Sequence, residues 1–219
     1  MTLTLVIETS SNISSVAIGS GKGVSKEILF DSDSEFAGKK YVEVSFLVQH
    51  GLKTLGKSIH DIEAIAVDAG PGRLMSIRNG IAFANAIAFA SNTNLYALCS
   101  FDLMGFEAWQ AMQMPIICTA KGSNGNAYVC LYTQGECAQT KFGPLAATVQ
   151  TLTAELPEFA VAGEYRDALT QLATPAQVHD STIQLAKAST FFKLNQPITD
   201  PKFLKQQIVT PVNEHSFIA

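Results

Sequence analysis

The chain has 219 residues, of which 47% are hydrophobic and only 16% are charged. This balance excludes an intrinsically disordered chain, and the length suits one large domain or two small ones. Fifteen Lys and Arg residues against nineteen Asp and Glu residues give a net charge of -4, with no run of three basic residues. A protein that binds nucleic acid alone needs a basic stripe. We therefore expect any contact with RNA to be indirect, through a partner.

The hydrophobic segments lack the pattern of a targeting or membrane-spanning sequence. Residues 1–7 are apolar but have no charged region or cleavage site of a signal peptide. The longest apolar stretch, residues 81–90, is interrupted by Asn85 and is far shorter than the ~20 residues of a membrane span. None of the four cysteines has CxxC spacing: Cys99, Cys118, Cys130 and Cys137. We expect reduced, buried thiols in a cytoplasmic protein that does not bind membranes.

The hydrophobic pattern predicts an α/β protein. Short apolar runs bounded by turn residues predict strands, and apolar residues at spacings of three and four predict helices. The predicted strands cover residues 3–7, 14–19, 24–30, 62–67, 94–99, 116–119, 127–132 and 159–162. The predicted helices cover residues 41–55, 76–90, 101–112 and 181–192. Strands that alternate with helices after an initial meander are typical of mixed sheets flanked by helices.

The helix predicted over residues 76–90 is apolar around nearly its whole circumference. Such a helix is buried on most sides, either inside the core or between its own sheet and a partner subunit. Val42 and Phe46 lie off the main inward face of the preceding helix, which favours the partner. We expect the two helices to form a helical-bundle interface lined by Val42, Phe46, Gly80, Phe83, Ala84 and Ile87.

Two segments have residue types that suit a phosphate group. Glu8, Thr9 and Ser10 follow the first predicted strand, and a carboxylate with small hydroxyl residues suits a nucleotide phosphate with Mg²⁺. The same residue types suit an ordinary turn. Gly70 and Gly72 flank a proline between a strand and a helix. Backbone N–H groups there attract anions, or the glycines only let two backbones pass closely.

Other chemistries lack their sequence pattern. The Gly-Ser-Gly-Lys-Gly segment at residues 19–23 lacks the spacing of a P-loop and precedes a strand, so it predicts a hairpin turn. The four histidines show neither HxxxH nor HExxH spacing, so we expect no catalytic metal. No Gly-x-Ser-x-Gly elbow is present. We therefore assign no catalytic residue and no metal ligand.

The two phosphate-like segments also carry a resemblance to a known family. Residues 5–10 with residues 15–18 resemble the opening strands of ASKHA (actin/Hsp70/sugar-kinase-like) proteins. Residues 62–72, followed by Arg78 and Gly80, resemble the signature of the TsaB (YeaZ) family, which is also labelled peptidase M22-like or a glycoprotease homologue. The resemblance covers residues 1–112 and weakens beyond them.

The chain departs from the family pattern at three places. Residues 73–76 read Arg-Leu-Met-Ser where the family usually has Ser-Phe-Thr-Gly. Residues 119–121 read Thr-Ala-Lys where Asp-Ala-Arg is expected, and a His usual at the start of the first long helix is missing. The resemblance therefore indicates a divergent member.

The resemblance implies an ASKHA fold with two subdomains, residues 1–112 and 113–219. It implies a non-catalytic, cytoplasmic subunit that supports a TsaD-like catalytic subunit, with a TsaE-like ATPase, in forming N6-threonylcarbamoyladenosine at position 37 of tRNA. Such a chain forms a homodimer when alone and requires no cofactor.

A weak site for ATP or ADP with Mg²⁺ would use the residues of both phosphate-like segments, Glu8, Thr9, Ser10, Gly70 and Gly72. Two alternatives stay open. One is an ASKHA-type phosphotransferase or hydrolase that uses ATP at these residues. The other is a self-dimerising paralogue outside tRNA modification.

Overall fold

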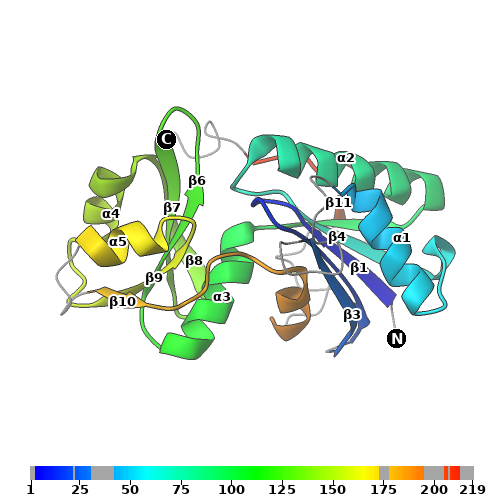
Figure 1. Ribbon diagram of the computed structural model, residues 1–219, viewed down its shortest axis with the longest axis horizontal. Coiled ribbons are helices and arrows are strands. Elements are labelled where there is room, and N and C mark those ends of the chain that lie inside the picture. The colour runs from blue at the N-terminus through cyan, green and yellow to red at the C-terminus, as the bar shows by residue number, and fades with distance from the viewer. Residues whose placement is uncertain are drawn as a thin grey trace.

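The structure, a computed structural model, describes residues 3–21, 23–30, 42–172, 178–194, 205–206 and 208–212. Within these ranges two sheets stand side by side, with helices on their outer faces and one helix between them (Figure 1). The first sheet has the order β11-β5-β4-β1-β2-β3 and the second the order β10-β9-β6-β7-β8. Both contain parallel and antiparallel pairs, as the sequence predicts for mixed sheets.

The bounds of the elements follow the chain. The strands of the first sheet are β1 (Leu3–Glu8), β2 (Ser14–Ser20), β3 (Gly23–Phe30), β4 (Ala64–Asp68), β5 (Asn94–Leu98) and β11 (Lys205–Gln206). Those of the second sheet are β6 (Ile116–Lys121), β7 (Asn126–Thr133), β8 (Glu136–Pro144), β9 (Phe159–Gly163) and β10 (Val178–Asp180). The helices are α1 (Val44–Thr54), α2 (Leu74–Ser91), α3 (Ser100–Met112), α4 (Leu145–Thr153), α5 (Arg166–Leu172) and the 3₁₀ turns η1 (Ile59–Asp61) and η2 (Ala188–Lys193).

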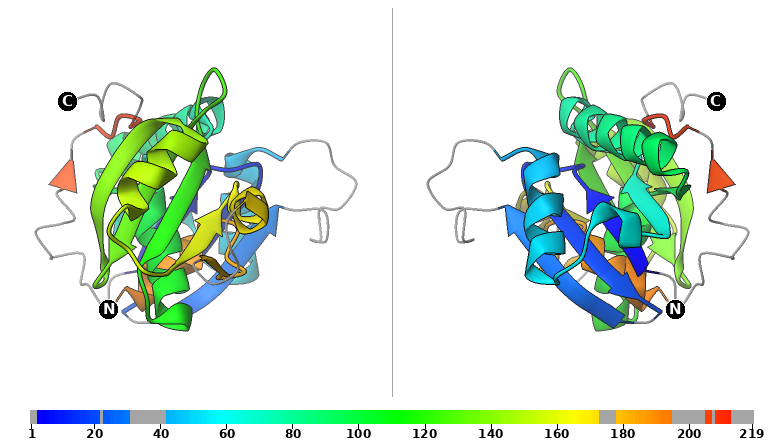
Figure 2. Two further views of the ribbon diagram at one scale, coloured as in Figure 1. Left: turned by 90° about the vertical axis from the view of Figure 1, so that its left-hand side faces the viewer. Right: turned by 90° about the vertical axis from the view of Figure 1, so that its right-hand side faces the viewer.

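The first sheet is buried on both faces. Alternate residues of a strand point to opposite sides, and β1 shows this directly: Leu5 and Ile7 pack in the core beneath α1 and α2, whereas Val6 packs in the core that contains α3. Figure 2 shows α1 and α2 together on the same face of this sheet. A strand buried on both faces has a continuous run of apolar residues, and the apolar run at residues 3–7 therefore predicted β1 correctly.

Helix α3 joins the two halves. Its residues Phe101, Leu103 and Met104 belong to one core cluster with residues of both sheets. Gly105 permits the closest approach, because a Cβ atom there would lie 2.4 Å from the ring of Tyr132 on β7. The predicted subdomain boundary at residues 112 and 113 stays a prediction. The described residues show that η2 and β11, late in the chain, pack against the first sheet.

The later half of the chain departs most from the predicted elements. Residues 181–187 are irregular and only 188–193 form a short 3₁₀ helix, so the helix predicted over 181–192 is wrong. β8, α4 and α5 were not predicted. β8 is an edge strand with mostly half-exposed or exposed residues, so it lacks the apolar alternation that marks a strand.

The structure also corrects the prediction of four reduced thiols. Cys130 on β7 and Cys137 on β8 form a disulfide, with their Cα atoms 6.4 Å apart. The β7–β8 hairpin brings the two residues together, and its register shifts after Leu131. Since β8 was not predicted, this proximity was not apparent from the spacing. Cys99 and Cys118 are free thiols.

Among the described residues, no helix combines the length and the apolar character needed to cross a bilayer.

Candidate functional site

Two acidic side chains meet at one edge of the first sheet. Glu8 ends β1 and Asp68 ends β4, and these strands are parallel neighbours with Ile7 opposite Val67. Both side chains are buried, with 1% and 0% of their surfaces exposed. The parallel pairing therefore places two buried carboxyl groups together, a costly arrangement for two charges.

Short hydrogen bonds hold each carboxyl group in place. Oε1 of Glu8 accepts hydrogen bonds from the backbone N–H of Ser10, at 2.6 Å, and from the Ser10 hydroxyl. Oδ1 of Asp68 accepts from the backbone N–H of Gly70 at 2.8 Å and from the hydroxyl of Ser100 at 3.1 Å. The second oxygen of each carboxyl group has no hydrogen-bond partner among the described residues.

Burial changes the titration of both groups. Desolvation raises the pKa of Glu8 well above its ordinary range, and the neighbouring charge of Asp68 raises it further. Desolvation also raises the pKa of Asp68, to about 6. Two carboxyl groups in one dry site do not both ionise readily, so the pair holds a proton over a wider pH range than free carboxyl groups do. We call Glu8 and Asp68 the acid pair.

The Gly-Pro-Gly loop packs directly on the segment that carries the acid pair. A Cβ atom at Gly72 would lie 2.3 Å from the backbone oxygen of Ser10, and one at Gly80 would lie 2.5 Å from Oγ1 of Thr9. The backbone N–H of Arg73 donates to that same Ser10 oxygen at 2.7 Å. The structure thus brings the two phosphate-like segments together, as close packing of backbones rather than as an open cradle.

This packing bears on the predicted nucleotide site. The residues named for ATP or ADP with Mg²⁺ are neighbours, and the backbones of Gly72 and Ser10 pack directly against each other. The geometry favours the alternative that the two glycines serve the close approach, and nucleotide binding at these residues stays a prediction.

Sequence reasoning missed two residues of this site. Asp68 directly follows the predicted strand 62–67, and its position beside the Gly-Pro-Gly loop was a usable signal. Ser100 begins α3, and its hydroxyl donates to both Asp68 and the backbone oxygen of Pro71. Nothing in its local sequence marks Ser100, because its role depends on β5 lying beside β4.

The predicted interface residues fall into two groups. Val42, Gly80 and Ala84 are buried in the isolated chain, so the prediction that they line an exposed partner surface is corrected. α2 rests on the sheet with Ile77, Ile81, Ala84 and Ala88 in the core. Phe46 is 42% exposed, and Phe83 and Ile87 are half-buried.

An apolar groove of about 610 Å³ lies between α1 and α2. Its apolar lining comes from Val48, Leu52, Ile59, Phe83 and Ile87. Outside the groove, two further apolar side chains of α2 that sequence reasoning did not name are exposed, Met75 at 68% and Phe89 at 91%. We call the groove together with these two side chains and that of Phe46 the α1–α2 face.

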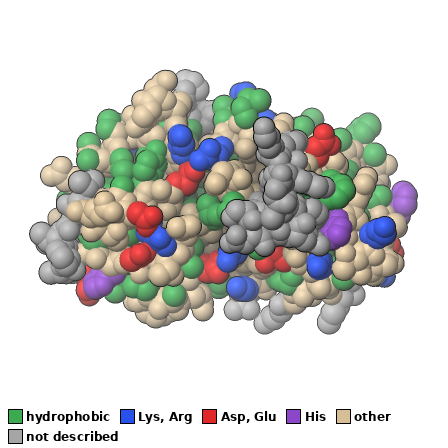
Figure 3. All heavy atoms as spheres, viewed as in Figure 1, with side chains coloured by type: hydrophobic (Ala, Val, Ile, Leu, Met, Phe, Trp, Pro, Cys, Tyr) green, Lys and Arg blue, Asp and Glu red, His purple; other side chains and the backbone are tan. Residues whose placement is uncertain are grey.

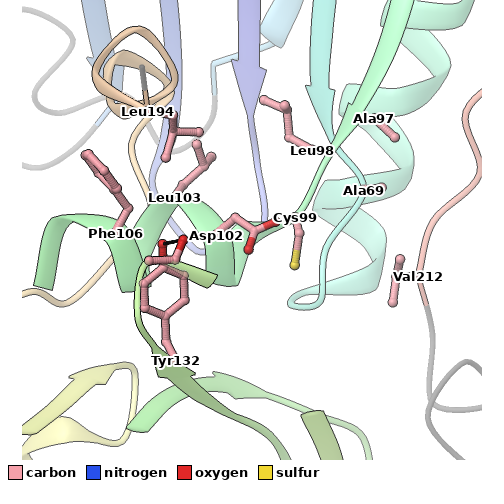
Figure 4. A pocket seen from close by; sticks show the side chains of 11 residues that line it. Ala69, Ala97, Leu98, Cys99, Asp102, Leu103, Phe106, Tyr132, Leu194 and Val212 are labelled. Carbon is pink, nitrogen blue, oxygen red and sulfur yellow. Dashed lines mark hydrogen bonds between the residues drawn. The ribbon is translucent and has the colours of Figure 1, made fainter. Parts of the chain in front are cut away.

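A second cavity, of about 310 Å³, lies between the halves beside α3 (Figure 4). Figure 4 shows mainly apolar side chains around it, with Cys99, Asp102 and Tyr132 as the exceptions. The Tyr132 hydroxyl donates to the backbone oxygen of Gly135 at 2.7 Å. Desolvation raises the pKa of the Cys99 thiol to about 12, which keeps it protonated and unreactive as a nucleophile.

The fold is that of ASKHA proteins. The YeaZ structure from Pseudomonas aeruginosa superposes with a TM-score of 0.73 at 17% identity, over 97% of this chain and 99% of that one. A second structure, of an uncharacterised P. aeruginosa protein with similarity to peptidase YeaZ, gives 0.75 at 18% identity with the same coverage. The ethanolamine utilisation protein EutJ of Carboxydothermus hydrogenoformans gives 0.52 at 11% identity, over 90% of this chain and 91% of that one.

Sequence comparisons lead to a related group. A tRNA N6-adenosine threonylcarbamoyltransferase of Caldicellulosiruptor bescii is 32% identical over 108 residues, which are 44% of this chain and 32% of that protein. The enzyme of the same name from Staphylococcus haemolyticus is 36% identical over 101 residues, 41% of this chain and 30% of that protein. This chain therefore spans about a third of the length of these curated relatives. The family model described as "TsaD: tRNA N6-adenosine threonylcarbamoyltransferase" matches residues 35–204, and the chain belongs to this family.

Proposed function

We propose that this chain takes part in forming N6-threonylcarbamoyladenosine in tRNA, as a non-catalytic subunit that supports a TsaD-type catalytic subunit. The observation that carries the proposal is the family match over residues 35–204. The YeaZ-like fold over 97% of the chain is consistent with it. A TsaE-type ATPase would be a further member of the assembly, and tRNA would be bound mainly through the partners.

The sealed state of the acid pair supports the non-catalytic part of the proposal. Glu8 and Asp68 are the acidic groups best placed for ASKHA-type chemistry, at the ends of adjacent parallel strands. Yet both side chains are buried, and the Gly72 loop packs against the backbone of Ser10 beside them. A group that cannot reach the substrate cannot act as acid, base or metal ligand.

The α1–α2 face supports the partner part of the proposal. Apolar grooves with large exposed side chains mark protein interaction sites, and a groove between two helices accepts the apolar side of a third helix. Phe89 and Met75 supply anchors of the large apolar type found at interface cores. If the partner subunit binds this face in only one of the partner's own conformations, binding stabilises that conformation of the partner.

The proposal is tested by co-expression with the TsaD-type subunit of the same organism, followed by the mass of the complex from light scattering. We expect a one-to-one complex, with Phe89→Glu preventing its formation. Val24→Glu is the matched control, because Val24 is also exposed, at 40%, but lies on β3 and is not a residue of this face. A homodimer that ignores the catalytic subunit would support the self-dimerising alternative.

The ATP-using alternative rests on the position of the acid pair alone. It requires the Gly72 loop to leave Ser10 so that a nucleotide enters. Titration of the chain with Mg²⁺ and ATP, followed by a phosphate-release assay, tests it. We expect weak binding or none and no turnover; tight binding with turnover that Glu8→Gln abolishes would overturn the non-catalytic assignment.

A further inference from the structure

Three of the four cysteines lie in a row across the second sheet. Cys118 on β6 pairs with Cys130 on β7 in the register of these antiparallel strands, and Cys130 forms the disulfide with Cys137 on β8. Because β7 lies between β6 and β8, Cys118 and Cys137 approach Cys130 from opposite sides. All three side chains pack in or against the core cluster that contains α3, so they lie on the same face of the sheet. We call them the cysteine row.

The register places Cys118 within disulfide-forming reach of Cys130. Directly opposite residues of an antiparallel pair have Cα atoms about 4.5 to 5.5 Å apart, and the Cα atoms of disulfide-bonded cysteines lie about 4.4 to 6.8 Å apart. The existing bond is diagonal, with Cα atoms 6.4 Å apart, because the hairpin register places Tyr132, two residues beyond Cys130, opposite Cys137. Cys130 therefore has two cysteines within reach and is bonded to one of them.

The present bond leaves the more buried of these two cysteines as a free thiol. Cys118 and Cys130 are fully buried, whereas Cys137 is half-buried on the edge strand β8. The bond joins residues only seven apart in the sequence, on strands that backbone hydrogen bonds already hold together, and a disulfide that closes a short loop stabilises a fold less than one that closes a long loop. The hairpin therefore does not depend on which partner Cys130 has.

We propose that the cysteine row is a thiol–disulfide exchange site, in which Cys118 displaces Cys137 from Cys130. The thiolate of Cys118 attacks Sγ of Cys130 from the side opposite Cys137. The Cys118–Cys130 bond forms, the Cys130–Cys137 bond breaks, and Cys137 takes up the proton that Cys118 has lost. The number of disulfides is unchanged, so the step needs no oxidant or reductant. Its product has a half-buried thiol at Cys137, which becomes a site for modification by thiol-reactive compounds.

The surroundings of Cys118 set the rate of this exchange. Burial raises the pKa of the Cys118 thiol strongly, and the neighbouring Cys99 and Asp102 raise it further; Tyr132 also lies close to it. Since only the thiolate attacks, a small fraction of the molecules is reactive at neutral pH. Effective molarities of well-oriented neighbouring groups reach about 10⁵ M, which offsets this small fraction for Cys118. Cys99 lies before α3, outside the strands of the second sheet, and has no disulfide opposite it.

The inference does not depend on the proposed function. The cysteine row shares no residue with the acid pair or with the α1–α2 face, where Figure 3 shows hydrophobic side chains at the surface over α2. Loss of partner binding and loss of thiol exchange can therefore be observed separately.

The test follows the position of the disulfide in the full chain by mass spectrometry. The native protein is incubated without reductant in the presence of N-ethylmaleimide, which traps each Cys137 thiol as it is released. It is then denatured in excess N-ethylmaleimide and cut with trypsin. Trypsin cuts after Lys121, which lies between Cys118 and Cys130, and there is no Lys or Arg between Cys130 and Cys137. The original bond therefore stays within one peptide, whereas the exchanged bond joins two.

We expect the wild type to accumulate joined peptides with N-ethylmaleimide on Cys137, about tenfold faster at pH 8 than at pH 7, because the thiolate fraction of Cys118 rises with pH. Cys118→Ala and Cys118→Ser both remove the attacking sulfur and should lower labelling of Cys137 at least tenfold. Cys99→Ser is the control, since it removes the other free thiol and should still give the joined, labelled peptides.

Three results would overturn the proposal. The first is a wild type in which Cys137 stays unlabelled and no joined peptides form. The second is labelling of Cys137 in both Cys118 variants at the wild-type rate, which would mean that Cys118 is not the attacking group. The third is joined peptides that persist in Cys118→Ala but disappear in Cys99→Ser, which would assign the attack to Cys99.

Discussion

The acid pair and the α1–α2 face invert the usual distribution of residues in opposite ways. At the acid pair, two carboxyl groups are buried, at 1% and 0% exposure. On the α1–α2 face, Phe89 is 91% exposed. A buried charge and an exposed large apolar surface both call for an explanation. The acid pair is covered by the protein's own Gly72 loop, whereas the side chain of Phe89 on the α1–α2 face is exposed to solvent.

This difference separates the two functional hypotheses. A nucleotide-dependent enzyme needs the acid pair to be accessible, whereas an accessory subunit needs the α1–α2 face to be accessible. Gly72 against Ser10 closes the former, and nothing among the described residues covers Phe89. The arrangement therefore favours a protein that acts by binding another one. Four experiments test whether the acid pair is closed and the α1–α2 face is accessible.

The largest effect is expected for Gly72→Ala. The added Cβ atom would lie 2.3 Å from the backbone oxygen of Ser10, and a backbone atom cannot turn aside as a side chain can. We expect the free energy of unfolding to fall by ~3 kcal/mol, measured by urea denaturation. Gly23→Ala is the control, since its nearest atom would be 3.9 Å away. Equal stability of the two variants would mean that the loop does not close the acid pair.

A smaller effect, dependent on pH, is expected for Glu8→Gln. The folded-state pKa values of Glu8 and Asp68 are raised, so the folded state binds more protons than the unfolded state once the pH exceeds the ordinary carboxyl pKa. These protons stabilise the folded wild type fully below about pH 4, and this stabilisation is lost as the pH rises through about 6 and above. The variant has no ionisable group at position 8, so it loses less stability than the wild type over this pH range.

We therefore expect Glu8→Gln to gain stability relative to the wild type as the pH rises from 5 to 8. Urea denaturation at both pH values measures this. Glu63→Gln removes a carboxyl group at an exposed position and serves as the control. A relative stability that does not change with pH would show that the acid pair is not desolvated.

Arg73 and Glu164 form an ion pair at 2.9 Å, which we call the Arg73–Glu164 bridge. It is expected to contribute about 1 kcal/mol, because Glu164 is 17% exposed and Arg73 40% exposed. Glu164→Ala should lower the free energy of unfolding, measured by urea denaturation, by that amount, and less so at high salt. Asp167→Ala breaks the pair with Arg166, in which Asp167 is 69% exposed, and should cost less. The reverse order would contradict the bridge as the firmer of the two pairs.

The smallest effect on stability is expected on the α1–α2 face. Phe89→Ser should change the free energy of unfolding by less than about 0.5 kcal/mol, because the side chain is 91% exposed and packs little in the isolated chain. Ala84→Glu, by contrast, would place a charge in the core, since Ala84 is 0% exposed. Thermal denaturation separates the two. A large loss of stability for Phe89→Ser would mean that this side chain serves the fold.

The first sheet was largely predictable because its strands are short apolar runs with clear turn boundaries, as at residues 3–7. The edge strand β8 was not, because partial exposure removes the alternation that reveals a strand. The helix over 76–90 was predicted, but its inward face was not. Nearly every face of it carries apolar residues, so the sequence alone could not decide whether Ala84 or Phe89 lies on the sheet.

The site shows the same limit. Glu8 and the glycines at 70 and 72 were named from their residue types and positions at strand ends, and the parallel pairing of β1 with β4 brings them together. The sequence does not show how closely the backbones of Gly72 and Ser10 approach each other, and this distance decides whether a ligand fits between the two segments. The partners of Asp68 and Arg73 lie 32 and 91 residues away in the chain, beyond any local pattern.

The most direct test of the proposed function is the N6-threonylcarbamoyladenosine content of tRNA from cells depleted of this chain, determined by nucleoside mass spectrometry. We predict that the modification falls on depletion, that the wild-type chain and Glu8→Gln restore it, and that Phe89→Glu does not. Unchanged modification on depletion would contradict a role in this pathway. Rescue by Phe89→Glu together with failure of Glu8→Gln would contradict the α1–α2 face and return the acid pair to the centre of function.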